Sequence, residues 1–478
     1  MRFVVEIITR KQSNTPSAKK CKQLFCALRE FFNSYLFYGI ETLVACLFVL
    51  MGEEVFGAIV FVALLGVILI VCDDILPTTL PFLLLCTFST NCYNSYDTFM
   101  SYAIYAPIVI LALIAHFVVY HKPFRLGQSV YGICGVSIAL LLGGIGNFSL
   151  MEYAYGSYYI LGLGIGMIVC YILMKSQFSP RRDYDLRERF SVIMMMMGLL
   201  CVAMIAIAYI RRITGNYNAH GVLGFSRNNI CTLLMFAMPF PLHLTKKTDW
   251  WALVTLLLFG AICVSTSRGG LLFGSVEFIV CCIYWVYIAK KKLYRILCVS
   301  LSIAALGLCC GSVILDIIND RILADNAIVN ESRYVMIWQA VERFLKNPLV
   351  GSGLLDNTID YGGYRKPGTM AWYHMMIPQV FGSMGLVGVA AYGLQALGRF
   401  KLIFMKTSSW SLALGISYLG ILMMSQVNPG EFCPLPFELL TVLLFVLQER
   451  RIEGDILPIK KNNIFERRIN KSKGKILK

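Results

Sequence analysis

The sequence predicts an all-α fold: a polytopic transmembrane bundle of about 12–14 helices with one long external loop. The composition is the first observation, because 58% of the 478 residues are hydrophobic and only 15% are charged. Soluble domains carry roughly 25% charged residues. The second observation is that the apolar residues form blocks of roughly 17–22, the length that a helix needs to cross a bilayer. Backbone groups in lipid have no water to bond, and these blocks are too long for barrel strands, so we expect helices.

Fourteen blocks are long and apolar enough to be considered as spans, and the weakest is 79–91, which is short and starts among prolines. The expected spans are 33–52, 55–72, 79–91, 100–120, 127–146, 156–174, 191–210, 225–244, 251–266, 271–289, 296–315, 373–397, 409–427 and 433–448. The chain is therefore expected to have five regions. They are a basic cytoplasmic segment (1–32), a first group of helices (33–315), an external loop (316–372), a second group of helices (373–448) and a basic cytoplasmic tail (449–478).

Lysine and arginine concentrate in alternate connections, which sets the orientation by the positive-inside rule. These cytoplasmic anchors include Lys122 and Arg125, Arg181 to Arg189, Lys246 and Lys247, Lys290 to Arg295, and Arg399, Lys401 and Lys406. Both termini are expected inside, and the protein is expected in the plasma membrane with its site on the outer face. The net charge of +16 belongs to these membrane-flanking segments, so nucleic acid is not an expected partner.

The 17 cysteines do not indicate a metal site, because most lie within spans and none forms a CxxC pair with zinc-like spacing. A thiol inside a span behaves as a small hydrophobic group. We expect no metal and no cofactor.

Arginine is unusual in the outer connections, which should be poor in positive charge. These connections nevertheless hold Arg211, Arg212, Arg227, Arg268 and Arg333, among others. Arg268 lies in Ser265-Thr266-Ser267-Arg268-Gly269-Gly270, between two spans. Such an arginine can simply extend its guanidinium to the interface. The two glycines, however, allow close approach of a ligand, and a guanidinium offers a planar fork of donors suited to phosphate.

His374 stands where the long outer loop returns to the membrane, in Trp372-Tyr373-His374-Met375. A single histidine is more often a structural residue than a catalyst. Its ordinary pKa near 6.5 nevertheless suits a base at neutral pH, and its position favours that role. The helix that follows carries Gln379 and then two glycines.

Four short motifs occur in order along 220–390, all on the expected outer side. They are Gly224-Phe225-x3-Asn229, Ser267-Arg268-Gly269-Gly270, Ser332-Arg333-x4-Trp338 with Pro348-Leu349-Val350-Gly351-Ser352-Gly353, and His374-x10-Gly385-x2-Gly388. Together they resemble the superfamily of O-antigen ligases and O-antigen polymerases. The first 190 residues are similar to it only in hydropathy.

The resemblance implies a GT-C-like membrane glycosyltransferase that takes a glycan from undecaprenyl diphosphate and transfers it to an acceptor sugar hydroxyl on the outer face. His374 would be the catalytic base and Arg268 would hold the diphosphate. The expected substrate-binding residues are Arg227, Arg212, Arg333, Asn229 and Gln379. The implied partners are the lipid-linked donor, the acceptor glycan and membrane lipid, with a flippase and a chain-length regulator as further candidates.

Three alternatives stay open at this stage. A polymerase for O-antigen, capsule or exopolysaccharide is favoured over a ligase that acts on lipid A core or another anchor. A polysaccharide flippase or secondary transporter is less favoured, because the halves show no repeat and Glu277 is the clear mid-span acid of the latter half. We interpret Glu277 as a packing residue. A membrane scaffold would give no reason for the outer arginines.

Two expectations concern architecture. The helices should enclose an outward-facing cavity lined by Arg268, Arg227 and His374, with the long loop folded over it. Within that loop, apolar residues recur at spacings of three and four over 331–345, which predicts a helix.

Overall fold

The protein folds as helices alone within the part of the chain that the computed structural model describes: residues 16–91, 106–120, 124–144, 160–178, 185–214, 227–317, 332–354, 373–428 and 430–454. The helices of the first half are α2 (Pro16–Phe32), α3 (Tyr35–Met51), α4 (Glu54–Val71), α5 (Leu76–Asn91), α7 (Ala106–Tyr120), α8 (Ser129–Leu142), the π-helix η1 (Ile160–Gly166), α10 (Met167–Gln177) and α11 (Leu186–Ile213). Those of the second half are α12 (Arg227–Ala237), α13 (Pro239–Leu244), η2 (Asp249–Trp251), α14 (Ala252–Val264), α15 (Arg268–Tyr287), α16 (Lys292–Ile317), α17 (Ser332–Lys346), α18 (Met376–Met405), α19 (Ser409–Met424), η4 (Gly430–Phe432), η5 (Pro434–Glu438) and α20 (Leu439–Ile452). Each of the fourteen expected spans overlaps at least one of these helices.

Five of the described helices are long and apolar enough to cross a membrane, or six if the bent pair α2 and α3 forms one span. Five shorter apolar helices of 10–17 residues accompany them. This confirms an all-α polytopic bundle, while the number of spans, 12–14, stays a prediction.

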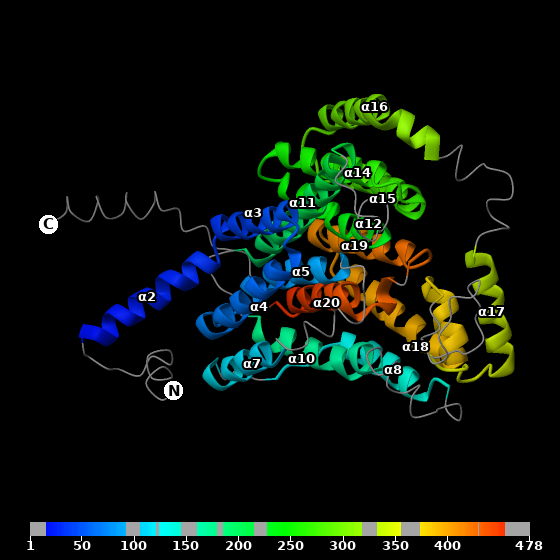
Figure 1. The fold of residues 1–478 in the computed structure, drawn as a ribbon, viewed down its shortest axis with the longest axis horizontal. Helices are drawn as coiled ribbons and strands as arrows, with labels where there is room; N and C mark the ends of the chain where they lie inside the picture. Colours follow the sequence, from blue (N-terminus) through cyan, green and yellow to red (C-terminus); the bar gives the residue numbers. More distant parts are fainter. Residues whose placement is uncertain are drawn as a thin grey trace.

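Helix α20 lies at the centre of the bundle, with every residue from Leu439 to Arg451 buried (Figure 1). A helix that is apolar on all sides requires protein on all sides. The peripheral helices differ, because α3, α7 and α16 leave large apolar side chains such as Leu43, Leu111 and Leu308 exposed. An exposed apolar belt of this kind is what a lipid-facing surface needs.

Helices α8 and α18 pack along each other through small residues. A Cβ atom on Gly132 would come within 2.9 Å of the Gln395 backbone, so only glycine allows this approach. Helix α17 packs against α18 at the end of the bundle opposite α2, and it crosses the direction of most other helices (Figure 1). Its bounds confirm the predicted helix over 331–345.

The structure corrects one expectation about charge. Arg399 was expected to anchor a cytoplasmic loop, but α18 continues to Met405, and Arg399 lies inside that helix with 2% exposure. Its guanidinium forms ion pairs with Glu431 and Glu438. Position near the end of an apolar block therefore does not distinguish an anchor from a buried ion pair.

Candidate functional site

Arg268 is the first residue of α15, directly after the N-cap Ser267. The Ser267 hydroxyl accepts a hydrogen bond from the Gly270 backbone N–H at 3.0 Å, which satisfies one of the free donors of the first turn. Thr266, one residue earlier, has φ of 60°. A β-branched residue rarely adopts this left-handed conformation, so the surrounding contacts must hold it there.

The two glycines after Arg268 serve helix packing. A Cβ atom on Gly269 would come within 2.5 Å of the Val427 side chain, and one on Gly270 within 2.6 Å of the Cys231 sulfur. The space at these glycines, which was expected to admit a ligand, is thus occupied by protein side chains. The start of α15 packs there against α12 and the end of α19.

The start of α12 is tied to the same segment by side chains. The Arg227 guanidinium donates to the Thr266 hydroxyl at 2.8 Å, and the Ser267 hydroxyl donates to the Asn228 carboxamide oxygen at 2.7 Å. Arg227 and Arg268 thus begin two helices whose first turns are joined.

Both helices carry an arginine, and no acidic residue, in their first turn. The same is true of α17, which begins with Ser332 and Arg333. A cation is disfavoured near a helix N-terminus, where the backbone N–H groups present partial positive charge. The cation and the backbone N–H groups are both stabilised when an anion lies between them. Proteins use this arrangement to bind phosphate groups.

His374 is exposed and has φ of 53°. Gln379 holds the chain on one side of it, because its side-chain oxygen accepts from the Tyr373 backbone N–H at 3.1 Å and its amide donates to the Ser383 hydroxyl at 3.0 Å. On the other side, the Met376 backbone N–H donates to the Ser425 carbonyl at 2.8 Å.

These contacts meet at one turn, formed by residues 425–428 and 430–432, which we call the site turn. The Ser425 carbonyl accepts from Met376, two residues after His374, while Val427 packs on Gly269, next to Arg268. Asn428 donates its side-chain amide to the Asn229 carboxamide oxygen at 2.8 Å. The site turn therefore contacts the segments of His374, Arg268 and Arg227, although the three lie far apart along the chain.

Thr266 and His374 are the two non-glycine residues with positive φ in the described part of the chain. Both lie in segments that contact the site turn. Residues in sparsely populated backbone conformations cost of order 1–3 kcal/mol each and concentrate at functional sites.

The glycine motifs hold α18 and the loop before it together. Gly385 has φ of 59° and ψ of −151°, which breaks α18 and frees backbone groups. The loop at 348–353 then docks on the break: Ser352 and Gly353 donate to the carbonyls of residues 382 and 383, and the Leu386 N–H donates to Pro348. This part of the predicted family motif is structural.

The remaining predicted residues divide into two groups. Asn229 and Gln379 use their side chains in the contacts given above, and Gln379 is 1% exposed. The side chains of Arg212 in α11 and Arg333 in α17 lie outside the described residues. Thr266, Ser425 and Asn428 were not predicted as site residues from the sequence. The only signal for Asn428 was a polar side chain ahead of Pro429-Gly430 in an outer connection.

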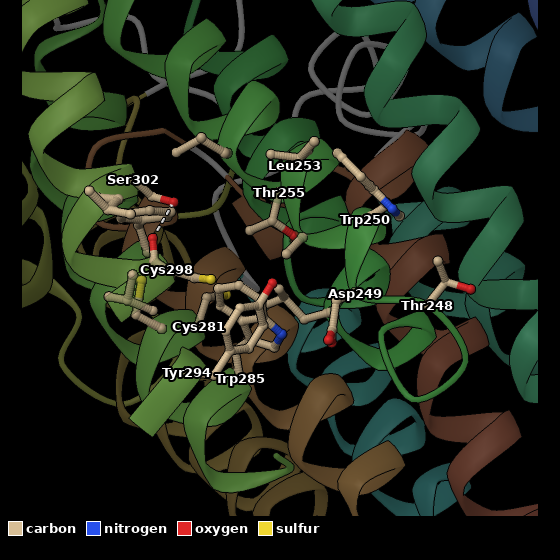
Figure 2. A pocket seen from close by; sticks show the side chains of 17 residues that line it. Thr248, Asp249, Trp250, Leu253, Thr255, Cys281, Trp285, Tyr294, Cys298 and Ser302 are labelled. Carbon is tan, nitrogen blue, oxygen red and sulfur yellow. Dashed lines mark hydrogen bonds between the residues drawn. The ribbon is translucent and has the colours of Figure 1, made fainter. Parts of the chain in front are cut away.

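A cavity of about 530 Å³ lies between α14, α15 and α16, lined by residues such as Trp285, Tyr294 and Cys298 (Figure 2). Trp285 stands near the end of α15 that is farthest from Arg268. This cavity is therefore separate from the predicted residues, and a cavity lined by Arg268, Arg227 and His374 stays a prediction.

The fold and its exposed apolar belt define a multi-pass, all-α membrane protein. Residues 253–393 match the family model described as O-antigen ligase, which places this part of the chain in the superfamily of O-antigen ligases and polymerases. The family is one of membrane glycosyltransferases of the ligase and polymerase type. The match includes Arg268, Arg333, His374 and Gln379, whereas Arg212, Arg227, Asn229 and the site turn lie outside it. Comparisons with curated proteins and with solved structures found no match.

Proposed function

We propose that this protein transfers a glycan from undecaprenyl diphosphate to an acceptor sugar hydroxyl at the outer face of the plasma membrane. The family match supports the class of enzyme. One structural observation supports the location of the site: the segments that carry Arg227, Arg268 and His374 all contact the site turn.

In this reaction the acceptor oxygen attacks the anomeric carbon, a new C–O bond forms, and the bond from that carbon to the diphosphate breaks. The diphosphate leaves with the bonding electrons, and the acceptor proton passes to His374. The leaving group gains negative charge in the transition state, so fixed positive charge near it accelerates the step.

Arg268 is assigned to the diphosphate, because it offers a guanidinium fork beside the N-terminal N–H groups of α15. Arg227 is next in order, since it begins the adjoining helix, and Arg212 and Arg333 are further candidates. We assign Asn229 and Gln379 supporting roles in place of direct substrate contact, because their side chains hold the site turn and the His374 segment.

A surface polysaccharide polymerase is our first choice, because the Gly224-Phe225-x3-Asn229 segment resembles that of polymerases. A ligase is the second, because the matched family model carries that description. Transport is less favoured. We interpret Glu277, the mid-span acid, as a packing residue, because it is fully buried with its carboxyl group against Gly420.

The test is transfer by the purified protein in vesicles, with a synthetic undecaprenyl-diphosphate glycan as the donor. Longer lipid-linked glycans would identify a polymerase, and transfer to added lipid A core would identify a ligase. Movement of the donor across the vesicle membrane without a new glycosidic bond would identify a transporter and contradict the proposal.

A further inference from the structure

Arg399 forms a deeply buried ion-pair cluster beside the site turn. Its guanidinium lies 2.7 Å from a Glu431 carboxylate oxygen and 2.6 Å from a Glu438 carboxylate oxygen, and all three side chains are at most 5% exposed. Gln395 donates to Glu438 at 2.9 Å. One guanidinium thus joins α18 to two carboxylates of the segment between α19 and α20.

The two carboxylates have different positions in the chain. Glu431 belongs to the site turn, and its backbone N–H donates to the Ser425 hydroxyl at 3.2 Å. Gly430 has φ of 51° and passes so close to Ser425 that a Cβ atom would overlap its hydroxyl. Glu438 lies outside the site turn, at the beginning of α20.

Glu431 therefore connects the buried guanidinium of Arg399 to the segments that carry His374 and Arg227. Glu431 contacts the Ser425 hydroxyl, and the Ser425 carbonyl accepts from the backbone N–H of Met376, two residues after His374. Asn428, in the same turn, bonds to Asn229 at the start of α12. Displacing Glu431 would displace the common support of the His374 and Arg227 segments.

We propose that Glu431, held by Arg399, is a positioning residue for the transfer reaction, and that it acts by fixing the site turn. This inference rests on the function proposed above. A displacement of about 1 Å in a reacting group can lower the rate about a hundredfold, so a support that touches no substrate can still affect turnover strongly.

Glu438 provides a matched control. E431Q and E438Q each remove one carboxylate charge and leave the other for the guanidinium, so neither leaves the buried arginine unpaired. Both amides can still hydrogen bond to Arg399. The two variants differ in whether the altered side chain belongs to the site turn, and E438Q in addition changes the acceptor of the Gln395 amide.

The experiment compares E431Q, E438Q and S425A with the wild-type full-length protein, at equal folded amounts and known melting temperature. S425A removes the hydroxyl that accepts from the Glu431 backbone N–H and leaves the buried charges unchanged. It therefore tests the same support if E431Q folds poorly. Hydrogen exchange is measured over residues 227–235 and 373–382, and transfer is measured with the synthetic donor.

We expect faster exchange in both segments for E431Q and S425A and little change for E438Q. Transfer should fall about ten- to a hundredfold in E431Q, because kcat falls while the KM for the donor stays the same. In E438Q the loss of transfer should be less than about threefold. Equal exchange in E431Q and E438Q would overturn the positioning role. If exchange follows the expected pattern but the wild-type protein transfers nothing, the positioning role stands and the proposed function fails.

Discussion

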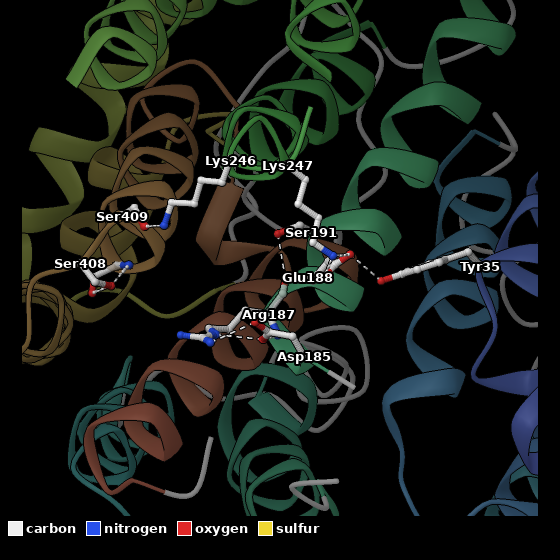
Figure 3. A network of polar contacts seen from close by, with 10 residues as sticks. Tyr35, Asp185, Arg187, Glu188, Ser191, Lys246, Lys247, Ser408 and Ser409 are labelled. Carbon is white, nitrogen blue, oxygen red and sulfur yellow. Dashed lines mark hydrogen bonds and ion pairs between the residues drawn. The ribbon is translucent and has the colours of Figure 1, made fainter. Parts of the chain in front are cut away.

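The starts of α11 and α15 differ in the charged residues that their first turns carry, although both are helix N-termini at an end of the bundle. The first turn of α11 contains Glu188, which accepts from Lys247 at 2.6 Å and from Tyr35 at 2.9 Å (Figure 3). Next to it, Arg187 forms two hydrogen bonds of 3.0 Å with the Asp185 carboxylate. The first turn of α15 carries Arg268 and no acid.

Other cations at the two ends have partners of both kinds. At the α11 end, Arg295 pairs with Asp249 and Lys175 with Glu449, whereas the side chains of Arg29, Lys246, Arg450 and Arg451 donate to neutral oxygens. At the other end, Arg227 donates to a hydroxyl and Arg211 to backbone carbonyls. A neutral partner orients a guanidinium without cancelling its charge. Under the function proposed above, we expect the α15 end to hold an anion and the α11 end to anchor the protein.

The largest expected effect separates Arg268 from Arg187. R268K should reduce transfer about a hundred- to a thousandfold, or ~2.7–4 kcal/mol, because lysine offers a point charge where the guanidinium offers a fork. R187K at the paired end should change transfer less than about twofold. Both are measured as transfer per folded molecule, and equal losses in the two variants would remove the functional distinction between the ends.

Glycine substitution should show a similar contrast in stability along α18. G385A should cost about 2–4 kcal/mol, because Gly385 has positive φ and a Cβ atom would lie 2.6 Å from the Gly351 nitrogen. Gly393, further along the same helix, has no atom within 4 Å of such a Cβ position, so G393A should be neutral or slightly stabilising. Thermal unfolding in detergent compares the two, and a tolerated G385A would contradict the docking of the loop at 348–353.

Backbone strain at the α15 end provides a third test. T266G relieves the left-handed conformation of a β-branched residue but removes the hydroxyl that accepts from Arg227. We expect a gain of about 1 kcal/mol in stability and a loss of about tenfold in transfer. A variant that gains stability and keeps full transfer would show that Thr266 does not orient Arg227 for function.

The smallest effect concerns pH at the α11 end. Burial opposes ionisation of Asp185, but the hydrogen bonds and charge of Arg187 outweigh it and hold the pKa of that carboxyl below its ordinary value. The resulting stability is present above the unfolded pKa of about 3.9 and is lost as pH falls through the folded pKa. D185N should therefore cost about 0.5 kcal/mol near pH 7 and progressively less below pH 4. Melting temperatures measured across this range check it, with transfer near pH 7 unchanged.

The helices were predictable from sequence because an apolar block of bilayer length has few other folds available. Helix α17 was predictable from its spacing of apolar residues. The buried state of Arg399 was not, because its partner Glu431 lies 32 positions further along the chain and nothing local marks the pair.

The candidate residues themselves were predictable from the sequence, but the contacts that hold their segments in place were not. Arg268 and His374 stand out as charged or titratable residues at span ends. The link between Asn229 and Asn428 spans 199 positions, and nothing in the sequence shows that they meet. Threonine gives no signal for a left-handed conformation either, so the strain at Thr266 appears only in three dimensions.

The most direct test of the central claim is transfer by H374A, measured per folded molecule beside binding of the lipid-linked donor. A base is needed only as the new bond forms, so turnover should be lost while donor binding stays close to that of the wild-type protein. Full transfer by well-folded H374A would contradict the assignment of His374 as the base.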